Sequence, residues 1–221
     1  MNTRTGSFTR CLAAFVFASL GVLSVGCGDD DTIAPMPDSG GARDATTADG
    51  GASDDGGAPV DAPAAALVLT SSAFEEGARF PDLYTCASTT DTSPPLAWTG
   101  GPAETQSWAI VFTDRDNALI HWAIWDIPAG VRALPEGVPN VRDLDGELAG
   151  ARQARSFDGS TYGFLGPCPG EEHTYEFVLY AVDAAMLPDL GPDPSREAVE
   201  AAILGGGHSL ASASLSGTWS P

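Results

Sequence analysis

Four side chains that can donate or accept protons lie at the ends of strongly apolar stretches of the chain. Asp114 closes one apolar run, His121 opens the next, and His173 and Tyr175 open a third. Unpaired polar groups are unfavourable in a buried core. An acid, two imidazoles and a phenol at strand ends are therefore typical of a pocket rim. We therefore predict that these four side chains meet around one small site.

Several chemistries fit these residue types. For a phosphate-sized anion, imidazole N–H and phenol O–H groups donate to oxygens, the backbone N–H groups of the turn 166–170 can add donors, and Asp114 fixes a tautomer or accepts from a hydroxyl or amine. Two His and one Asp could also bind zinc, but the chain lacks the closely spaced His pair of a helix-borne zinc site. A serine hydrolase is a further alternative, although no Gly-x-Ser-x-Gly motif occurs and Ser93 or Ser160 would be arbitrary nucleophiles.

Other polar and aromatic residues have structural interpretations. A single His in a strand is more often a satisfied structural residue than a ligand, so the prediction rests on the group and not on one imidazole. His208 follows three glycines, and we expect it at the surface or in packing. Asp126 and Asp183 end strand patterns and are interpreted as turn formers. Core or rim packing is expected for the tryptophans Trp98, Trp108, Trp122 and Trp125.

The elements that must position the site are mostly strands. Residues 134–159 have a weak pattern, which predicts a long surface loop, and a long loop beside a site is often functional. One helix is predicted, with Asp193 as N-cap and Pro194 at the first helical position, and it stops at three glycines, 205–207. Several predicted strands and one predicted helix favour a mainly antiparallel β fold with a peripheral helix near the C-terminus. Apolar or alternating patterns predict strands at 67–70, 96–98, 108–113, 121–127, 173–183 and 210–219.

The first 65 of the 221 residues do not look like part of a folded domain. Residues 1–27 have the layout of a bacterial signal peptide, with two arginines and an apolar run shorter than the roughly 20 residues of a membrane span. The end of this segment, Ser24-Val25-Gly26-Cys27, resembles a lipobox, so we expect lipid on Cys27, with ordinary secretion as the alternative because Ser24 replaces the usual aliphatic residue. The sequence therefore predicts an exported protein of the cell envelope, on the periplasmic face or at the outer membrane.

Residues 28–65 consist almost wholly of Asp, Gly, Ala, Pro, Ser and Thr. Such a segment cannot bury enough apolar surface to offset its ordering entropy, so it is predicted to be a disordered acidic linker with a reach of roughly 30–35 Å. The remaining residues, 66–221, suffice for one domain with one core. They hold 21 acidic residues against 7 Arg and no Lys, a net charge of −14 that excludes broad electrostatic binding of nucleic acid or anionic lipid.

The four cysteines have different expected roles. Cys11 lies in the signal peptide and Cys27 is the expected lipid attachment point. Cys86 and Cys168 remain as a pair in an exported, oxidising setting, where a disulfide is the default. Two free thiols stay an alternative, and two cysteines alone do not make a metal site.

Motifs occur in one order along almost all of Leu67–Trp219: Ser72–Gly77, Tyr84–Cys86, Ser93–Trp98, Thr113–Asp116, His121–Trp122, Ile127–Ala129, Gly166–Pro169 and His173–Asp183. In this set the chain resembles the phosphatidylethanolamine-binding protein family, in its bacterial Raf kinase inhibitor-like branch. The resemblance implies an antiparallel Greek-key β-sandwich with a small anion pocket at one end. By matching motifs, the family's pocket residues fall on Asp114, His121, Gly166, Pro167, His173 and Tyr175.

The sequence departs from the family pattern at the loop before His121. Arg115 replaces the Pro of the Asp-Pro-Asp motif, Thr174 replaces the Arg of the His-Arg-Tyr motif, and the loop is several residues shorter. Arg115 could add a guanidinium to a bound anion, or pair with Asp116 or another surface acid.

From the residues and the resemblance we expect a non-enzymatic module that binds a small anion or a phosphate-bearing head group such as phosphoethanolamine, without a metal or cofactor. Its other partner is the membrane, through the lipid on Cys27, and no protein partner is indicated. The alternatives are a protein-interaction or inhibitor module at the cell envelope and a phosphoester hydrolase.

Overall fold

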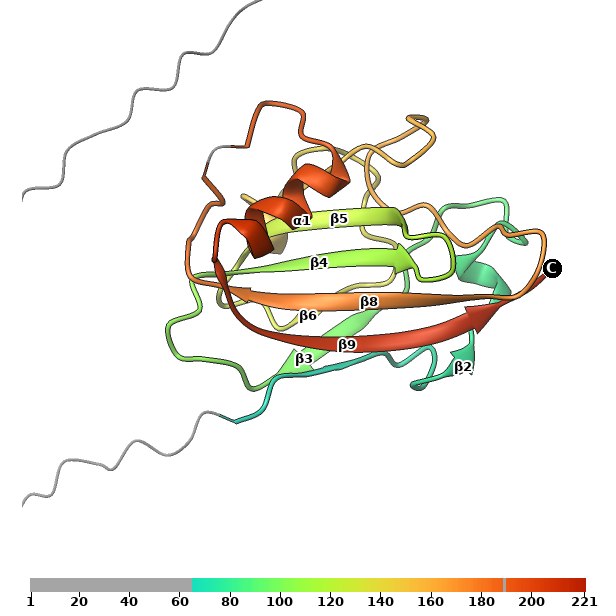
Figure 1. Ribbon diagram of the computed structural model, residues 1–221, viewed down its shortest axis with the longest axis horizontal. Coiled ribbons are helices and arrows are strands. Elements are labelled where there is room, and N and C mark those ends of the chain that lie inside the picture. The colour runs from blue at the N-terminus through green and yellow to red at the C-terminus, as the bar shows by residue number, and fades with distance from the viewer. Residues whose placement is uncertain (1–64, 189) are drawn as a thin grey trace, which may run out of the picture. The chain divides into compact units, whose positions relative to one another are not determined.

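The computed structural model describes residues 65–188 and 190–221; the predicted signal peptide and nearly all of the predicted linker lie outside these residues. In this part of the chain no helix is both long and apolar enough to cross a membrane. Two sheets form the domain (Figure 1), and all pairs are antiparallel except β2 with β9. The small sheet has the order β1 (Val68–Thr70), β3 (Leu96–Thr99), β6 (Ala133–Leu134). The large sheet has the order β2 (Ala78–Arg79), β9 (Ser209–Trp219), β8 (His173–Val182), β4 (Ser107–Asp114), β5 (Leu119–Pro128), β7 (Arg152–Gln153).

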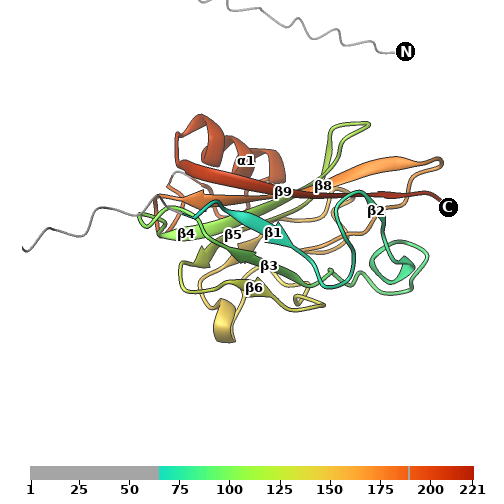
Figure 2. The same cartoon turned by 90° about the horizontal axis from the view of Figure 1, so that it is seen from below.

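The large sheet is the middle layer of three, with the small sheet on one face and α1 (Arg196–Gly205) on the other (Figure 2). Because both faces are covered, the central strand β4 is apolar without a break from Trp108 to Phe112 and has no exposed residue. Val199 and Ile203 of α1 pack with Trp125 and other residues on one face. The opposite face meets the small sheet through a core rich in aromatic residues, and all four tryptophans expected in the core or rim are buried.

The mainly antiparallel sandwich with one peripheral helix is confirmed. Strands β4 and β5 form a hairpin, and after a long connection β8 returns to the other side of β4, which is the kind of crossing that a Greek-key sandwich requires. The surface loop predicted at 134–159 is only partly a loop, because Leu134 belongs to β6, Gly146–Leu148 form a 3₁₀ turn, and β7 joins the large sheet beside β5.

The predicted start of the helix was wrong by two residues. Ser195 is the N-cap, and its side chain accepts a hydrogen bond from the Ala198 N–H at 3.2 Å. Asp193 lies two residues before the N-cap, and its carboxylate instead accepts hydrogen bonds from Tyr162 and Arg155.

The interpretation of Asp126 as a turn former was also wrong. Asp126 lies within β5, is only 4% exposed, and has a φ of 57°. The register with β4 shifts here, so Asp126 belongs to a β-bulge, and Asp tolerates the left-handed conformation that the bulge requires. Its Oδ2 accepts from Arg152 Nη2 and Nε at 2.5 and 3.2 Å, and its Oδ1 accepts from the Leu187 N–H at 2.8 Å. Asp126 therefore holds β7 and the segment after β8 onto β5.

Asp126→Ala is expected to lower the free energy of unfolding by about 3–5 kcal/mol, because it leaves the largely buried Arg152 guanidinium without its carboxylate. The matched control is Asp143→Asn, whose side chain is 64% exposed and should change stability by less than about 0.5 kcal/mol. Urea denaturation followed by tryptophan fluorescence measures both. Equal losses in the two variants would contradict this account of Asp126.

Candidate functional site

The four predicted polar side chains converge at one end of the large sheet. Asp114 ends β4, His121 lies near the start of β5, and His173 and Tyr175 lie at the start of β8. Because β5 and β8 both run antiparallel to β4, the end of β4 meets both starts, and Asp114 is in register with Leu119 and Tyr175. The ring centroids lie 5.4 Å apart for His121 and Tyr175 and 6.3 Å apart for His173 and Tyr175.

These side chains line an open pocket of about 190 Å³. Its walls also include Asn117 from the β4–β5 loop, Phe157 from the long loop that follows β7, and Cys168 and Pro169 from the turn before β8. The lining residues are Asp114, Asn117, Leu119, His121, Phe157, Cys168, Pro169, His173 and Tyr175.

The buried carboxylate of Asp114 orients His173. Nδ1 of His173 donates to Asp114 Oδ2 at 2.6 Å, while Oδ1 accepts from the Asp116 N–H at 3.0 Å. This hydrogen bond to Asp114 is the main reason why the pKa of His173 is raised above that of a free imidazole. With Nδ1 engaged, Nε2 is the ring nitrogen left for a ligand, and it carries a proton when the ring is charged.

His121 lies among apolar rings, whereas His173 lies against a carboxylate. The ring is 3% exposed and packs edge-on against Phe112, Phe157 and Tyr175. Its Nδ1 lies 3.1 Å from the carbonyl oxygen of Leu165, which can only accept, so Nδ1 carries the proton. Burial lowers the pKa of His121, an effect that the Leu165 carbonyl and the Asp114 charge oppose only in part. The neutral ring therefore presents an unprotonated Nε2.

Tyr175 supplies a hydroxyl that stays protonated. The side chain is 1% exposed, and burial, together with the neighbouring Asp114 carboxylate, raises the pKa of Tyr175 well above its usual value. A phenol in this state donates a hydrogen bond throughout the physiological pH range.

Gly166 and Pro167 are not among the residues that line the pocket. A side chain on Gly166 would come within 2.5 Å of the Tyr84 carbonyl oxygen, so only glycine fits against that backbone. The Pro167 carbonyl accepts from the Cys86 N–H at 3.0 Å, and the disulfide predicted between Cys86 and Cys168 is confirmed. This turn is thus fastened to residues 84–86, and it fixes the neighbouring Leu165 carbonyl that orients His121.

Two residues near the pocket gave no clear signal in the sequence. Phe157, 38% exposed, packs on His121 from the long loop, where an aromatic residue in a polar stretch was the only hint. Arg196, at the start of α1, donates to the carbonyls of Ile120 and Arg155, both at 2.7 Å, and its charge lowers the pKa of His121. An Arg in the first turn of a helix looks like a surface residue from sequence alone.

The shortened β4–β5 loop does not bring a guanidinium to the pocket. Arg115 is 59% exposed and pairs with the surface acid Glu176 at 3.4 Å, which is the second of the two roles considered for it. Ala118 turns the loop with a φ of 58°, and Asn117 beside it accepts from the Leu119 N–H.

Asp114, Asp116 and His173 could also hold a metal ion, because their ligand atoms lie within 4.8 Å of one another. Those atoms already have partners: Asp114 Oδ2 accepts from His173, and Asp116 Oδ2 accepts from the Thr174 N–H at 2.7 Å. A metal needs the unprotonated imidazole, whereas the pKa of His173 is shifted towards the protonated form. The arrangement favours a protonated His173 bonded to Asp114 over a bound metal ion.

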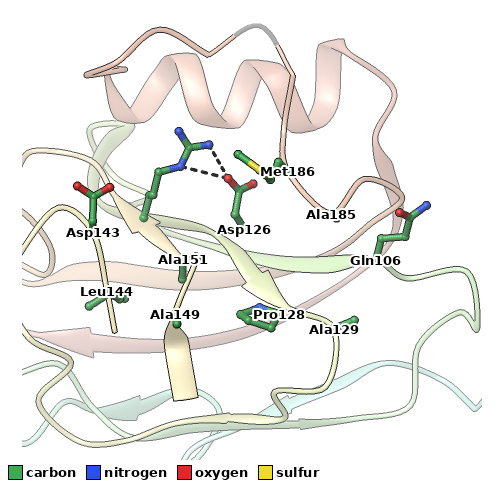
Figure 3. Close-up of a pocket in the computed structure, with 12 residues that line it drawn as sticks. Gln106, Asp126, Pro128, Ala129, Asp143, Leu144, Ala149, Ala151, Ala185 and Met186 are labelled. Carbon is green, nitrogen blue, oxygen red and sulfur yellow. Dashed lines mark hydrogen bonds and ion pairs between the residues drawn. The ribbon is translucent and has the colours of Figure 1, made fainter. Parts of the chain in front are cut away.

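A larger hollow of about 420 Å³ lies beside Asp126 (Figure 3). Both oxygens of its one buried carboxylate already accept hydrogen bonds, from Arg152 and from Leu187. Much of the remaining wall is apolar, with Pro128, Leu144 and alanines. This hollow lacks the group of imidazole and phenol donors found in the smaller pocket.

Known proteins are similar to this chain in sequence and in fold. A family model described as phosphatidylethanolamine-binding protein matches residues 70–220. A UPF0098 protein of Methanothermobacter thermautotrophicus is 38% identical over 156 residues, which are 68% of this chain and 97% of that protein. A UPF0098 protein of Aquifex aeolicus is 30% identical over 158 residues, covering 70% of this chain and 89% of that protein.

Two crystal structures are similar to this chain. The phosphatidylethanolamine-binding protein homologue CT736 from Chlamydia trachomatis has a TM-score of 0.59 and 31% identity, and the match covers 71% of this chain and 98% of that one. YbcL from E. coli, described as a member of the mammalian PEBP family, has a TM-score of 0.60 and 27% identity, with 71% and 99% covered.

The two pocket imidazoles are expected to titrate on opposite sides of the ordinary value near 6.5. His173 should lose its proton above that pH and His121 below it, because the hydrogen bond to Asp114 stabilises the charged ring of His173 and burial destabilises the charged ring of His121. Asp114→Asn should move the His173 midpoint down towards the ordinary value. NMR titration of the ring Cε1–H signals measures this, and coincident midpoints in the unsubstituted protein would refute the assignment.

Replacing both bridged cysteines, Cys86→Ser with Cys168→Ser, is expected to lower the free energy of unfolding by about 4 kcal/mol, because the cystine closes a long loop of sequence separation 82. Urea denaturation of the oxidised protein and of the double variant gives the difference. A loss below about 1 kcal/mol would show that the bridge adds little to stability.

Proposed function

Because the chain belongs to the phosphatidylethanolamine-binding protein family, we propose that its pocket binds the phosphate group of a small head group such as phosphoethanolamine, without catalysing a reaction. Family membership itself supports a binding function. The choice of ligand rests on one observation: around the same pocket, His173 hydrogen-bonds a buried carboxylate at 2.6 Å and buried His121 hydrogen-bonds a neutral carbonyl at 3.1 Å.

Each of the three side chains has a distinct part in this binding. Charged His173 donates Nε2–H to one phosphate oxygen, and Tyr175 donates its hydroxyl to another. Neutral His121 accepts with Nε2 from a protonated phosphate oxygen or from an amine of the ligand. The charge of His173 offsets that of Asp114, so the carboxylate behind it does not expel an anion.

The size of the pocket favours a head group over a whole lipid. Its volume of about 190 Å³ is below the roughly 300–1,000 Å³ of sites that enclose drug-sized ligands. A phosphate monoester fits this scale, while acyl chains would have to remain outside.

Binding without catalysis is supported by what lines the pocket. Among the described residues that form its walls there is no Ser or Thr, and Cys168 is held in the disulfide. A Ser, Thr or Cys nucleophile of the kind used in covalent hydrolysis is therefore not among these lining residues. We further propose that the domain is exported and held at the cell envelope by lipid on Cys27, with residues 28–65 as a spacer.

Calorimetry with phosphoethanolamine, inorganic phosphate and acetate tests this function. Saturable heat is expected with the two phosphates, and His121→Ala or His173→Ala should weaken binding by roughly tenfold or more, since each removes a hydrogen bond to a charged group. Affinity should fall as the pH rises through the raised pKa of His173, because the neutral ring bonded to Asp114 has no Nε2–H to donate.

The matched control is His208→Ala, because His208 lies outside the pocket and makes its own hydrogen bond to Asp183 at 2.7 Å. This variant should bind as the unsubstituted protein does. No heat with any of the three ligands, or equal losses in the His208 and His121 variants, would reject the proposed function. Release of inorganic phosphate from phosphoethanolamine, abolished by His173→Ala, would replace binding by hydrolysis.

A further inference from the structure

Strand β9 has an open edge over most of its length. One side of β9 pairs with β8 along the whole strand, whereas on the other side only Gly217 and Thr218 pair with β2. Figure 2 shows β2 near the C-terminal end of β9, and the short strand β1 of the small sheet packs against part of β9. The segment Leu210–Ser216 is therefore an edge of the large sheet.

Backbone groups on this edge point away from β8. At Ser216 the N–H donates to Glu76 Oε2 at 2.7 Å and the carbonyl accepts from the Gly77 N–H at 3.0 Å, so both groups face outwards. Orientation alternates along an antiparallel strand, so the N–H and carbonyl groups of Ser212 and Ser214 face the same way. In residues 65–188 and 190–221, no hydrogen bond occupies these four groups.

Glu76 and Gly77 cover the edge at Ser216, but the strand itself lacks the usual protection against pairing with another chain. Natural edge strands carry charged residues or Pro, or are covered. Leu210–Ser216 contains no charged residue and no Pro, and Ser212 and Ser214 are exposed.

A groove of about 350 Å³ lies beside the edge at Ser214 and Leu215. Buried Leu69, Phe74 and Leu215 contribute apolar surface to it, and Glu75 and Glu76 supply negative charge. A strand laid next to Ser212 and Ser214 would turn alternate side chains into this groove and the others to solvent.

We propose that this edge binds an extended, basic peptide segment of another protein by β-strand addition. The four outward backbone groups of Ser212 and Ser214 pair with the peptide, an apolar side chain fills the groove, and a Lys or Arg side chain meets Glu75, while the carboxylate of Glu76 stays bonded to Ser216. Charge selects this occupant: the domain has a net charge of −14, which opposes a second copy, and the acidic linker 28–65 is repelled by the same glutamates.

The test uses the full chain carrying Cys27→Ser, and a seven-residue peptide of alternating valine and lysine with blocked ends. Saturable amide shifts and slowed hydrogen exchange are expected at Ser212 and Ser214 in NMR spectra. The same peptide with glutamate in place of lysine should not bind. Ser214→Pro should weaken binding roughly tenfold or more, because it removes an outward N–H and adds a ring at the contact.

Ser214→Thr, the matched control, keeps the N–H and should bind within about twofold of the unsubstituted chain. The proposal is overturned if the lysine peptide does not bind, if Ser214→Pro binds it equally well, or if the glutamate peptide binds as tightly. A dimer in sedimentation velocity that Ser214→Pro abolishes would also overturn it, by assigning the edge to a second copy. If the Pro variant does not fold, hydrogen exchange at Ser212 and Ser214 in the unsubstituted chain decides the question.

Discussion

The antiparallel register of β4 with β5 on one side and β8 on the other is the constraint from which the pocket follows. It places Asp114, His121 and His173 at one end of the sheet, although His173 is separated from Asp114 by 59 residues. A slip of one residue would turn the side chains of a strand to the opposite face. Stacking of Phe112 on Phe177, with ring centroids 4.1 Å apart, ties the register to the core beneath the pocket.

The imidazole rings of His173 and His121 differ in their chemistry because their surroundings differ. His173 lies against a buried carboxylate, whereas His121 is enclosed by aromatic rings and bonded to a neutral carbonyl. Burial disfavours charge and a nearby carboxylate favours it, so the two pKa values move apart. The disulfide-fastened turn holds the carbonyl of Leu165 that fixes the tautomer of His121. The pocket thus offers both a charged donor and a neutral acceptor to one small ligand.

The sequence predicted what strong periodicity and residue type determine. Apolar runs with polar residues at their ends predicted the strands and the convergence of Asp114, His121 and His173, and the exported setting predicted the Cys86–Cys168 bridge, which the structure contains. The expected roles of these residues in ligand binding stay predictions.

What the sequence missed depends on contacts between distant segments. Asp126 looked like a strand end because Pro128 follows it, but a bulge lets β5 continue and Arg152 neutralises the carboxylate. The helix start shifted because Asp193 bonds side chains from the long loop instead of its own helix. Neither Phe157 nor the open edge of β9 has a local signature, since one depends on how a loop folds back and the other on which strand is absent beside it.

The central claim concerns the pocket, and a crystal structure of the domain soaked with phosphoethanolamine tests it most directly. We predict a phosphate group with its oxygens about 2.7–3.2 Å from His173 Nε2 and the Tyr175 hydroxyl. Density for the ligand elsewhere, or its absence from this pocket at saturating concentration, would contradict the account.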